Sequence, residues 1–298
     1  MVNEPYISIG LAFITSLTWG INAHILKKGV AEENPFLGVA IRSIFAFPIL
    51  FLITFLWRGI EGFTGYANQE VLFFTILGST LFATGDILYL VGLKKYPVNM
   101  LVPIVATYPI IAIFILIITG SEEVSPTVIF GTVIVIFGIG LVTNGDIAGI
   151  LNYKILSLGV LNALFYGFSV YYIKIALSFD TTDAISVSGI RTLILGLIGL
   201  IVFHSSSKNR DVRRQRSKES KMRSFKFLAV SGIIGWVIGA TAFFIAVERI
   251  GAAIPTPISS TYPIVATIIG LFLRIEEVSK KQFVGIIFSV LGTVIIIT

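Results

Sequence analysis

The chain contains no cysteine and only 2 histidines among its 298 residues. It can therefore form no disulfide, no thiolate nucleophile and no thiolate metal site. The sequence shows no serine with a neighbouring base and no spacing typical of metal ligands. It also lacks a Gly-Lys-Ser/Thr loop for nucleotide binding. We therefore expect no catalytic residue, no metal and no cofactor, and we expect that the protein is not an enzyme.

Charged residues are scarce as well, at 13% of the chain against 55% hydrophobic residues, and the mean hydropathy is +0.94. Such a composition cannot cover the surface of a soluble globule. Apolar runs of about 20 residues, the length needed to cross a bilayer, recur along the chain. They do not alternate as barrel strands would. The sequence predicts an all-α, multi-pass protein of the cell membrane with ten transmembrane helices at 6–26, 35–57, 70–92, 98–119, 126–143, 152–174, 183–204, 225–247, 252–273 and 280–298.

Most of the 22 Lys and Arg residues fall in loops that follow odd-numbered spans. By the positive-inside rule these loops would be cytoplasmic and both termini outside. The longest of them, 205–226, carries a dense basic cluster and little that could pack, so we expect it to be disordered and to contact anionic lipid headgroups. No aromatic stacking residues are interleaved with this cluster. We therefore expect no nucleic-acid partner.

Residues 77–144 return at 231–298 with a constant offset of 154 residues. The repeated features are Gly78/Gly232, Gly85/Gly239, Pro103/Pro257, Thr-Tyr-Pro-Ile at 107–110 and 261–264, and Glu-Glu-Val-Ser at 122–125 and 276–279. Each half holds five predicted spans, an odd number, so the second copy must enter the bilayer upside down. Inverted repeats around a central cavity are typical of secondary transporters. We expect one five-helix repeat in 1–147 and a second in 148–298.

Most of the repeated residues have a structural interpretation. The glycines allow helices to approach closely in lipid, where packing depends on small residues. The prolines at 103, 109, 257 and 263 would kink the fourth and ninth spans. Ser125 and Ser279 are expected to cap the helices that follow them, and Glu122, Glu123, Glu276 and Glu277 to have capping or interface roles at span ends.

Few ionisable residues lie inside the predicted spans, and such residues normally face a partner or a wet cavity. Arg42 and Asp86 are expected at similar depth and could form an ion pair. Asp86 could alternatively couple transport to protons, or contact substrate. Arg191 occupies the place of Arg42 in the second half, but the counterpart of Asp86 is Ala240. Arg191 would then use Glu248, backbone carbonyls or an anionic group on a substrate.

Aromatic and amide side chains within the spans complete the candidate site. Trp19 and Tyr166 stand at corresponding places in the two halves, and Tyr89 lies one helical turn from Asp86. Such rings either pack, anchor at the interface or line a cavity. We expect the cavity and substrate-binding residues to be Trp19, Asn22, Arg42, Asp86, Tyr89, Tyr166, Arg191 and Trp236.

Trp19-Gly20 with Lys27, Arg42, the turn Gly-Leu-Lys-Lys-Tyr-Pro at 92–97 and Thr-Tyr-Pro-Ile at 107–110 resemble one repeat of the EamA family, part of the drug/metabolite transporter superfamily. The second half resembles it too, with Tyr166-Gly167, Lys174 and Arg191. The resemblance covers essentially the whole chain. It implies ten helices around a cavity that opens alternately to each side, export of an amino-acid-like or amphipathic metabolite, and, in contrast to the charge count, both termini in the cytoplasm.

Taken together, these features predict a carrier for a small-molecule substrate that works by alternating access. A channel would need a ring of charge or a carbonyl filter, which the sequence does not show. A non-transporting structural or receptor protein would not require the duplication. A facilitative channel and a structural or receptor protein remain the alternatives, and we expect a monomer or weak dimer.

Overall fold

The computed structural model describes residues 4–142, 153–205, 217–272 and 279–298, and within these ranges every regular element is a helix. The helices are α1 (Glu4–Val30), α2 (Pro35–Arg58), η1 (Gly59–Ala67), α3 (Gln69–Lys95), α4 (Val98–Val105), α5 (Tyr108–Thr119), α6 (Pro126–Val142), α8 (Tyr153–Leu177), α9 (Ala184–Ser205), α11 (Lys218–Gly232), η2 (Ile233–Ala240), α12 (Thr241–Ile250), α13 (Pro255–Ser259), α14 (Tyr262–Phe272) and α15 (Lys280–Ile297). The prediction of an all-α protein is confirmed for these ranges.

Within the described ranges, eight helical runs are long and apolar enough to cross a membrane: Glu4–Val30, Pro35–Ala67, Gln69–Lys95, Val98–Thr119, Tyr153–Leu177, Ala184–Ser205, Lys218–Ile250 and Lys280–Ile297. Their outer faces expose large apolar side chains such as Leu56, Trp57 and Phe73. A surface of this kind is suited to lipid, so the chain is a multi-pass membrane protein. Two of the ten predicted spans fall short. α6 has 17 residues, and the ninth predicted span is divided into α13 and α14.

The fourth and ninth predicted spans are interrupted rather than bent. α4 ends at Val105 and α5 begins at Tyr108, and α13 and α14 are separated in the same way at Ser260 and Thr261. Pro109 and Pro263 have no N–H to continue the helix and disfavour helical geometry in the residue before them. The hydroxyls of Thr107 and Thr261 donate to the carbonyl oxygen three residues earlier, at 2.8 and 2.7 Å. The repeated Thr-Tyr-Pro motif therefore ends one helix and starts the next.

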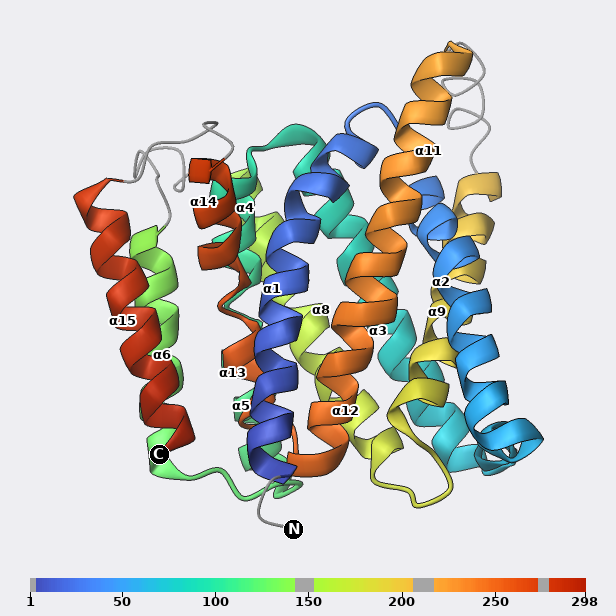
Figure 1. Cartoon of the computed structure of the whole chain (residues 1–298), viewed down its shortest axis with the longest axis horizontal. Helices are drawn as coiled ribbons and strands as arrows, with labels where there is room; N and C mark the ends of the chain where they lie inside the picture. Colours follow the sequence, from blue (N-terminus) through green and yellow to red (C-terminus); the bar gives the residue numbers. More distant parts are fainter. Residues whose placement is uncertain (1–3, 143–152, 206–216, 273–278) are drawn as a thin grey trace.

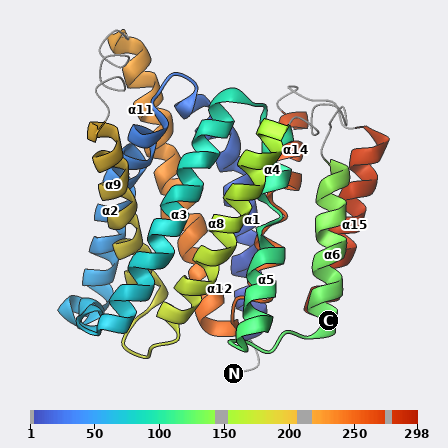
Figure 2. The same cartoon turned by 180° about the vertical axis from the view of Figure 1, so that it is seen from behind.

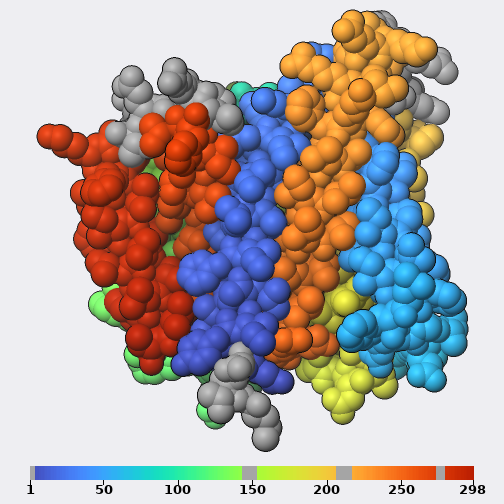
Figure 3. All heavy atoms as spheres, in the orientation of Figure 1, coloured from blue at the N-terminus to red at the C-terminus, as the bar shows by residue number. Residues whose placement is uncertain are grey.

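Helices of the first half pack against helices of the second half throughout the molecule (Figures 1 and 2). α2 lies beside α9, α3 beside α8, and α6 beside α15. On the face seen in Figure 3, α1 lies between α14 and the run from α11 to α12. Both labelled chain ends lie at the same end of the bundle, opposite the start of α11. The core is therefore an interface between the two halves of the sequence.

Glycines set the contact between α6 and α15, as the sequence predicted. A Cβ atom added at Gly131 would lie 2.7 Å from the carbonyl oxygen of Gly292, and one at Gly138 would lie 2.6 Å from that of Gly285. The order of these contacts makes the two helices antiparallel. It is also reciprocal, because Gly285 is the repeat equivalent of Gly131 and Gly292 that of Gly138.

Repeated glycines also lie at two further interfaces, that of α3 with α8 and that of α1 with η2. The Asn162 side chain donates to the carbonyl of Gly85, and the Thr15 hydroxyl donates to the carbonyl of Gly239 at 3.1 Å. Gly85 and Gly239 are repeat equivalents, and a Cβ at either would meet an aromatic side chain, Tyr166 or Trp19, at less than 3 Å. These contacts place the two matched rings beside the centre of the bundle.

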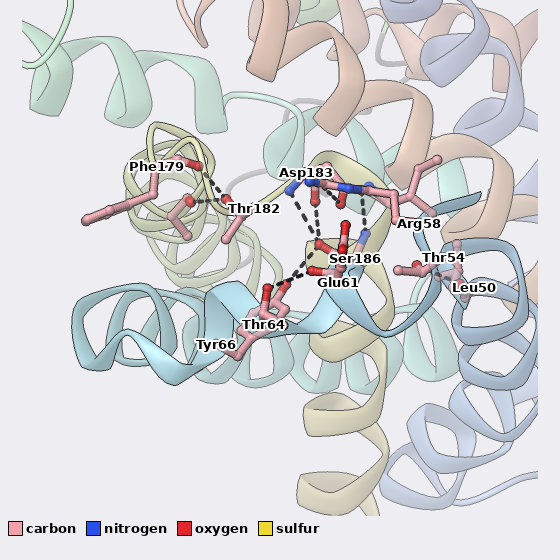
Figure 4. A network of polar contacts seen from close by, with 12 residues as sticks. Leu50, Thr54, Arg58, Glu61, Thr64, Tyr66, Phe179, Thr182, Asp183 and Ser186 are labelled. Atoms are coloured by element: carbon pink, nitrogen blue, oxygen red, sulfur yellow. Dashed lines mark hydrogen bonds and ion pairs between the residues drawn. The ribbon is translucent and has the colours of Figure 1, made fainter. Parts of the chain in front are cut away.

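A polar network joins η1 to the start of α9 (Figure 4). Arg58 and Asp183 form an ion pair with Nη1 and Oδ2 3.0 Å apart. The other carboxylate oxygen of Asp183 accepts hydrogen bonds from the backbone N–H groups of Ile185 and Ser186, both at 2.9 Å, and so caps α9. The Tyr66 hydroxyl donates to Ser186 Oγ at 3.4 Å. This network holds α2 and α9, the helices of Arg42 and Arg191, at one end.

The predicted caps are confirmed where they are described. Ser125 Oγ accepts from the N–H of Val128 at 3.3 Å, and Ser279 forms a capping box with Gln282. Glu122 bridges to the second half, because its two carboxylate oxygens accept from the N–H groups of Ala252 and Ala253 at 2.8 and 2.9 Å. Glu276 and Glu277 lie outside the described residues.

The expected disorder of the basic loop 205–226 is wrong for its last part. Residues from Lys218 to Lys226 form the first turns of α11, and Ser217 caps them by accepting from the N–H of Ser220 at 3.1 Å. The cap and an acidic residue in the first turn, Glu219, offset the repulsion among the basic side chains. Residues 206–216 lie outside the described residues.

Candidate functional site

A cavity of about 70 Å³ lies at the centre of the bundle, where helices of both halves meet. This is room for a few water molecules or part of a small ligand. All eight side chains singled out from the sequence contribute to its wall: Trp19, Asn22, Arg42, Asp86, Tyr89, Tyr166, Arg191 and Trp236. The structure adds a second group of lining residues, Ala23, Leu26, Phe82, Tyr108, Ser169, Val170, Gly235, Ala240, Phe243, Phe244 and Tyr262.

The lining is assembled from equivalent positions of the two repeats. At the offset of 154 residues, Phe82 matches Trp236, Tyr89 matches Phe243, Tyr108 matches Tyr262 and Asp86 matches Ala240; Trp19 matches Tyr166, Asn22 matches Ser169 and Arg42 matches Arg191 in the preceding spans. Most of the lining therefore occupies equivalent places in the two halves, with Leu26, Gly235 and Phe244 as exceptions. Among the matched pairs, Asp86 and Ala240 alone differ in formal charge.

The expected ion pair between Arg42 and Asp86 is present. Arg42 Nη1 lies 2.6 Å from Asp86 Oδ2, and each residue is 2% exposed. The Tyr166 hydroxyl donates to the other carboxylate oxygen at 3.4 Å. The Arg42 guanidinium also lies over the Trp236 ring, with Cζ 4.0 Å from the ring centroid. Asp86 is therefore held by α2 and α8 from opposite sides, and its charge is neutralised by Arg42.

Arg191 is buried against aromatic rings, and Asp86 lies near enough to act on it electrostatically without forming an ion pair with it. It is 1% exposed, and its Cζ lies 3.7 Å from the centroid of the Phe82 ring and 5.3 Å from that of Phe244. Among the residues that the structure describes, Arg191 makes no hydrogen bond or ion pair. Glu248, one of its expected partners, is exposed and forms no ion pair with Arg191. Cation–π contacts contribute only about 0.5–2 kcal/mol each, against several for desolvating an ion.

Donors outnumber acceptors among the unpartnered polar atoms of the described lining residues. Arg42 Nε, Arg191 Nε, Arg191 Nη1 and Trp236 Nε1 are buried N–H donors without a partner in the described ranges, and Asn22 Oδ1 is a buried acceptor without one. Two guanidinium groups and one carboxylate give the described lining a formal charge of +1. Buried polar groups are normally satisfied, so the site matches a ligand that brings acceptors and negative charge.

A π-helical segment, η2, carries Trp236 and ends at Ala240. Its counterpart in α3 is regular α-helix. π-helical turns are rare and are frequent at functional sites, because they shift side chains out of the α-helical register. Here the segment brings the Trp236 ring over Arg42. No feature of the sequence indicated this segment.

Known proteins resemble this chain in sequence and in fold. A sequence profile of the EamA-like transporter family matches residues 6–144 and, a second time, residues 153–298. The chain belongs to the EamA-like transporter family. The resemblance noted from the sequence is thereby confirmed, including its occurrence in both halves.

One similar chain is a protein of Archaeoglobus fulgidus described as an uncharacterised transporter. It is 25% identical over 299 residues, which cover 98% of each chain. A solved crystal structure superimposes with a TM-score of 0.75 over 97% of this chain and 95% of the other, at 12% identity, which shows a shared fold. Family membership and the membrane-spanning helices together make this protein a membrane transporter.

Proposed function

We propose that this EamA-family protein is a secondary transporter that moves a small metabolite across the cell membrane by alternating access around the central cavity. The observation that carries the proposal is the cavity itself, which lies between the halves and is lined by repeat-equivalent residues, among them the charged side chains of Arg42, Asp86 and Arg191. Rocking of one half against the other would expose such a site to each side in turn. No step requires covalent chemistry, and the proposal includes no enzymatic activity.

The proposed architecture is a pair of inverted five-helix repeats, in 1–147 and 148–298. Its support is the reciprocal glycine contact of α6 with α15, where Gly131 meets Gly292 and Gly138 meets Gly285. Two equivalent helices that pack antiparallel are related by a two-fold axis across them. In a membrane-spanning bundle that axis lies in the membrane plane, which is the relation between inverted repeats.

Ten spans are part of the same proposal. α6, with 17 residues, is about 26 Å long at the α-helical rise, and the 18 residues from Pro255 to Phe272 reach about 27 Å. Both lengths approach the bilayer hydrocarbon thickness of about 30 Å. We assign these segments as the fifth and ninth spans. A break within a span is tolerated where it lines a protein cavity, and Tyr108 and Tyr262 at the two breaks line this one.

The substrate is proposed to be amino-acid-like or another amphipathic metabolite, moved outward, on the strength of the family resemblance. Proton coupling through Asp86 belongs to the proposal, with opening of its ion pair with Arg42 as the conformational step. The basic loop 205–226 would contact anionic lipid headgroups, and the protein would act as a monomer or weak dimer without nucleic acid. The Lys and Arg distribution predicts that the termini lie outside, whereas the family resemblance predicts that they lie in the cytoplasm. The orientation of the termini therefore has to be measured.

Counterflow in proteoliposomes tests the proposal. Vesicles are first loaded with a defined mixture of amino acids and small carboxylic acids, and mass spectrometry identifies compounds released faster than from protein-free vesicles. The released compound, unlabelled inside, should then drive transient uphill accumulation of the labelled compound from outside. A channel would only equilibrate the label, and a receptor or structural protein would release nothing. Val170→Phe, which fills the cavity wall, should suppress both signals.

A further inference from the structure

Two arginine–aromatic pairs line the cavity and are related by the repeat. Arg42 of the first half stacks on Trp236 of the second, and Arg191 of the second half stacks on Phe82 of the first. Because Trp236 and Phe82 are repeat equivalents, the duplication has built the same cationic unit twice.

The two units differ in their counterion. Arg42 is paired with Asp86 at 2.6 Å, whereas the position equivalent to Asp86 is Ala240, which also lines the cavity. Arg191 therefore lacks the carboxylate that its counterpart has. Two of its nitrogens, Nε and Nη1, are buried donors without a partner among the described residues.

A guanidinium cannot lose its charge to escape burial, so this arrangement is costly in the empty protein. Phe82 and Phe244 offset part of that cost and add no negative charge. The remaining cost of burying the Arg191 charge would be removed by an external anion. That anion would lie beside Ala240, at the position equivalent to the Asp86 carboxylate.

We propose that Arg191 is the receptor for an anionic group of the substrate, and that this group, a carboxylate or a similar planar oxyanion, occupies the space beside Ala240 that mirrors Asp86. The inference rests on the proposed transport function and narrows its substrate class to amphipathic anions, at the expense of zwitterionic amino acids. A guanidinium binds a carboxylate through charge-assisted N–H···O hydrogen bonds, and Nε and Nη1 of Arg191 donate to no described residue. Trp236 Nε1 is a further such donor, near the other arginine.

The other residues that line the cavity indicate the polarity and net charge of the rest of the ligand. The rings of Phe243, Phe244 and Tyr262 enclose the cavity and favour an apolar or aromatic body. The carboxylate that could hold an ammonium group, Asp86, is already paired with Arg42. The site therefore favours a net monoanion over a zwitterion or a cation of the same size.

Substitutions at Ala240 test the proposal directly. Ala240→Asp supplies the missing carboxylate from the protein, and Ala240→Asn is the matched control of nearly equal volume without charge. Purified protein in chloride-free buffer is titrated with benzoate, benzamide, benzylamine and L-phenylalanine, and both affinity and thermal stability are measured. We expect benzoate alone to bind wild-type protein and the Asn variant. In the Asp variant its affinity should fall about 30-fold or more, and the ligand-free melting temperature should exceed that of the Asn variant.

Arg191→Met provides the second arm and keeps the proposal testable if Ala240→Asp does not fold. It should abolish benzoate binding and leave the melting temperature of the empty protein unchanged or higher, whereas loss of a structural arginine would lower it. Equal benzoate affinity in the Asp and Asn variants, equal binding of benzamide, or no binding of benzoate to wild-type protein would overturn the proposal. Chloride alone reproducing the benzoate effect would overturn the assignment to an organic anion.

The two proposals can fail separately. Benzoate binding that depends on Arg191, in a protein that shows no counterflow, would refute transport and leave the anion site in place. Counterflow that survives Arg191→Met unchanged would refute the anion site and leave transport in place.

Discussion

The buried pair of Arg42 and Asp86 gives a quantitative test of how the cavity is held together. Its charged atoms are 2.6 Å apart, and both residues are 2% exposed. Asp86→Asn and Arg42→Met each leave one member of the pair buried alone. The first also raises the formal charge of the described lining from +1 to +2, because Arg42 and Arg191 then remain without a carboxylate in the cavity wall.

The expected magnitude follows from burial and distance. Two unit charges about 4 Å apart attract by about 4 kcal/mol at an effective dielectric constant of 20, and removing one partner of a buried pair typically costs about 3–5 kcal/mol. Removing both partners leaves neither charge of the pair buried alone and costs much less. We therefore expect each single variant to lower the free energy of unfolding by about 3–5 kcal/mol. The double variant should lose less than either single variant, with a coupling energy of about 3 kcal/mol or more.

The assay is a double-mutant cycle on purified protein in detergent micelles, with the free energy of unfolding measured by denaturant titration for all four proteins. Arg58→Met, Asp183→Asn and their combination form a matched cycle on the partly exposed pair at the bundle end, for which a coupling below about 1 kcal/mol is expected. Additive losses at Arg42 and Asp86 would refute the reasoning. So would a coupling no larger than that of the exposed pair.

Three further predictions concern helix packing, the bridge between the halves and coupling. Gly138→Ala should destabilise the protein by about 1–3 kcal/mol through overpacking against α15, whereas Gly140→Ala, with open space at its Cβ, should be neutral or slightly stabilising; equal effects would contradict the interface. Glu122→Gln should cost about 1–3 kcal/mol in the same assay, with Glu123→Gln, an exposed neighbour, unchanged. Asp86→Asn should abolish the pH dependence of transport, and an unaltered pH profile would exclude proton coupling through this residue.

Much of the site could be predicted because the duplication marks it. Buried charge is expensive in a membrane, so Arg42, Asp86 and Arg191 stood out at once, and all three line the cavity. The offset between the halves identified Trp19 and Tyr166 as a matched pair. Both rings line the cavity, and each packs on one of two equivalent glycines, Tyr166 on Gly85 and Trp19 on Gly239.

Only some of the aromatic residues that line the cavity were predicted from the sequence. Phe82, Phe243 and Phe244 line the cavity, but in an apolar span nothing local separates a ring that faces a cavity from one that faces lipid. The repeat offset carries a usable signal, since it matches Phe82 with Trp236 and Phe243 with Tyr89. An aromatic residue whose repeat equivalent is also aromatic is therefore a better candidate for lining the cavity than one whose equivalent is not.

Backbone irregularities were the least predictable features. The π-helical segment η2 carries Trp236, whose ring contacts Arg42 from a distant part of the chain, and no local sequence signal marks that contact. The sequence predicted only a kink where the helix breaks after α4. Whether a proline kinks a helix or interrupts it depends on whether nearby groups donate hydrogen bonds to the carbonyl oxygens that lose their helical partners. Thr107 does so here. The extension of α11 to Lys218 depends on the cap at Ser217, a weak signal within a basic stretch.

Accessibility of the cavity from the two sides of the membrane tests alternating access most directly. Because the chain has no native cysteine, Val170→Cys places a single thiol in the cavity wall. Phe73→Cys, on the exposed face of α3, is the lipid-facing control. A charged, membrane-impermeant thiol reagent is applied to one side or the other of sealed vesicles. With alternating access, the thiol in the cavity wall reacts from both sides while the vesicles stay impermeable to the reagent and the control thiol stays unmodified. Reaction from one side only, or leakage of the reagent through the protein, would contradict it.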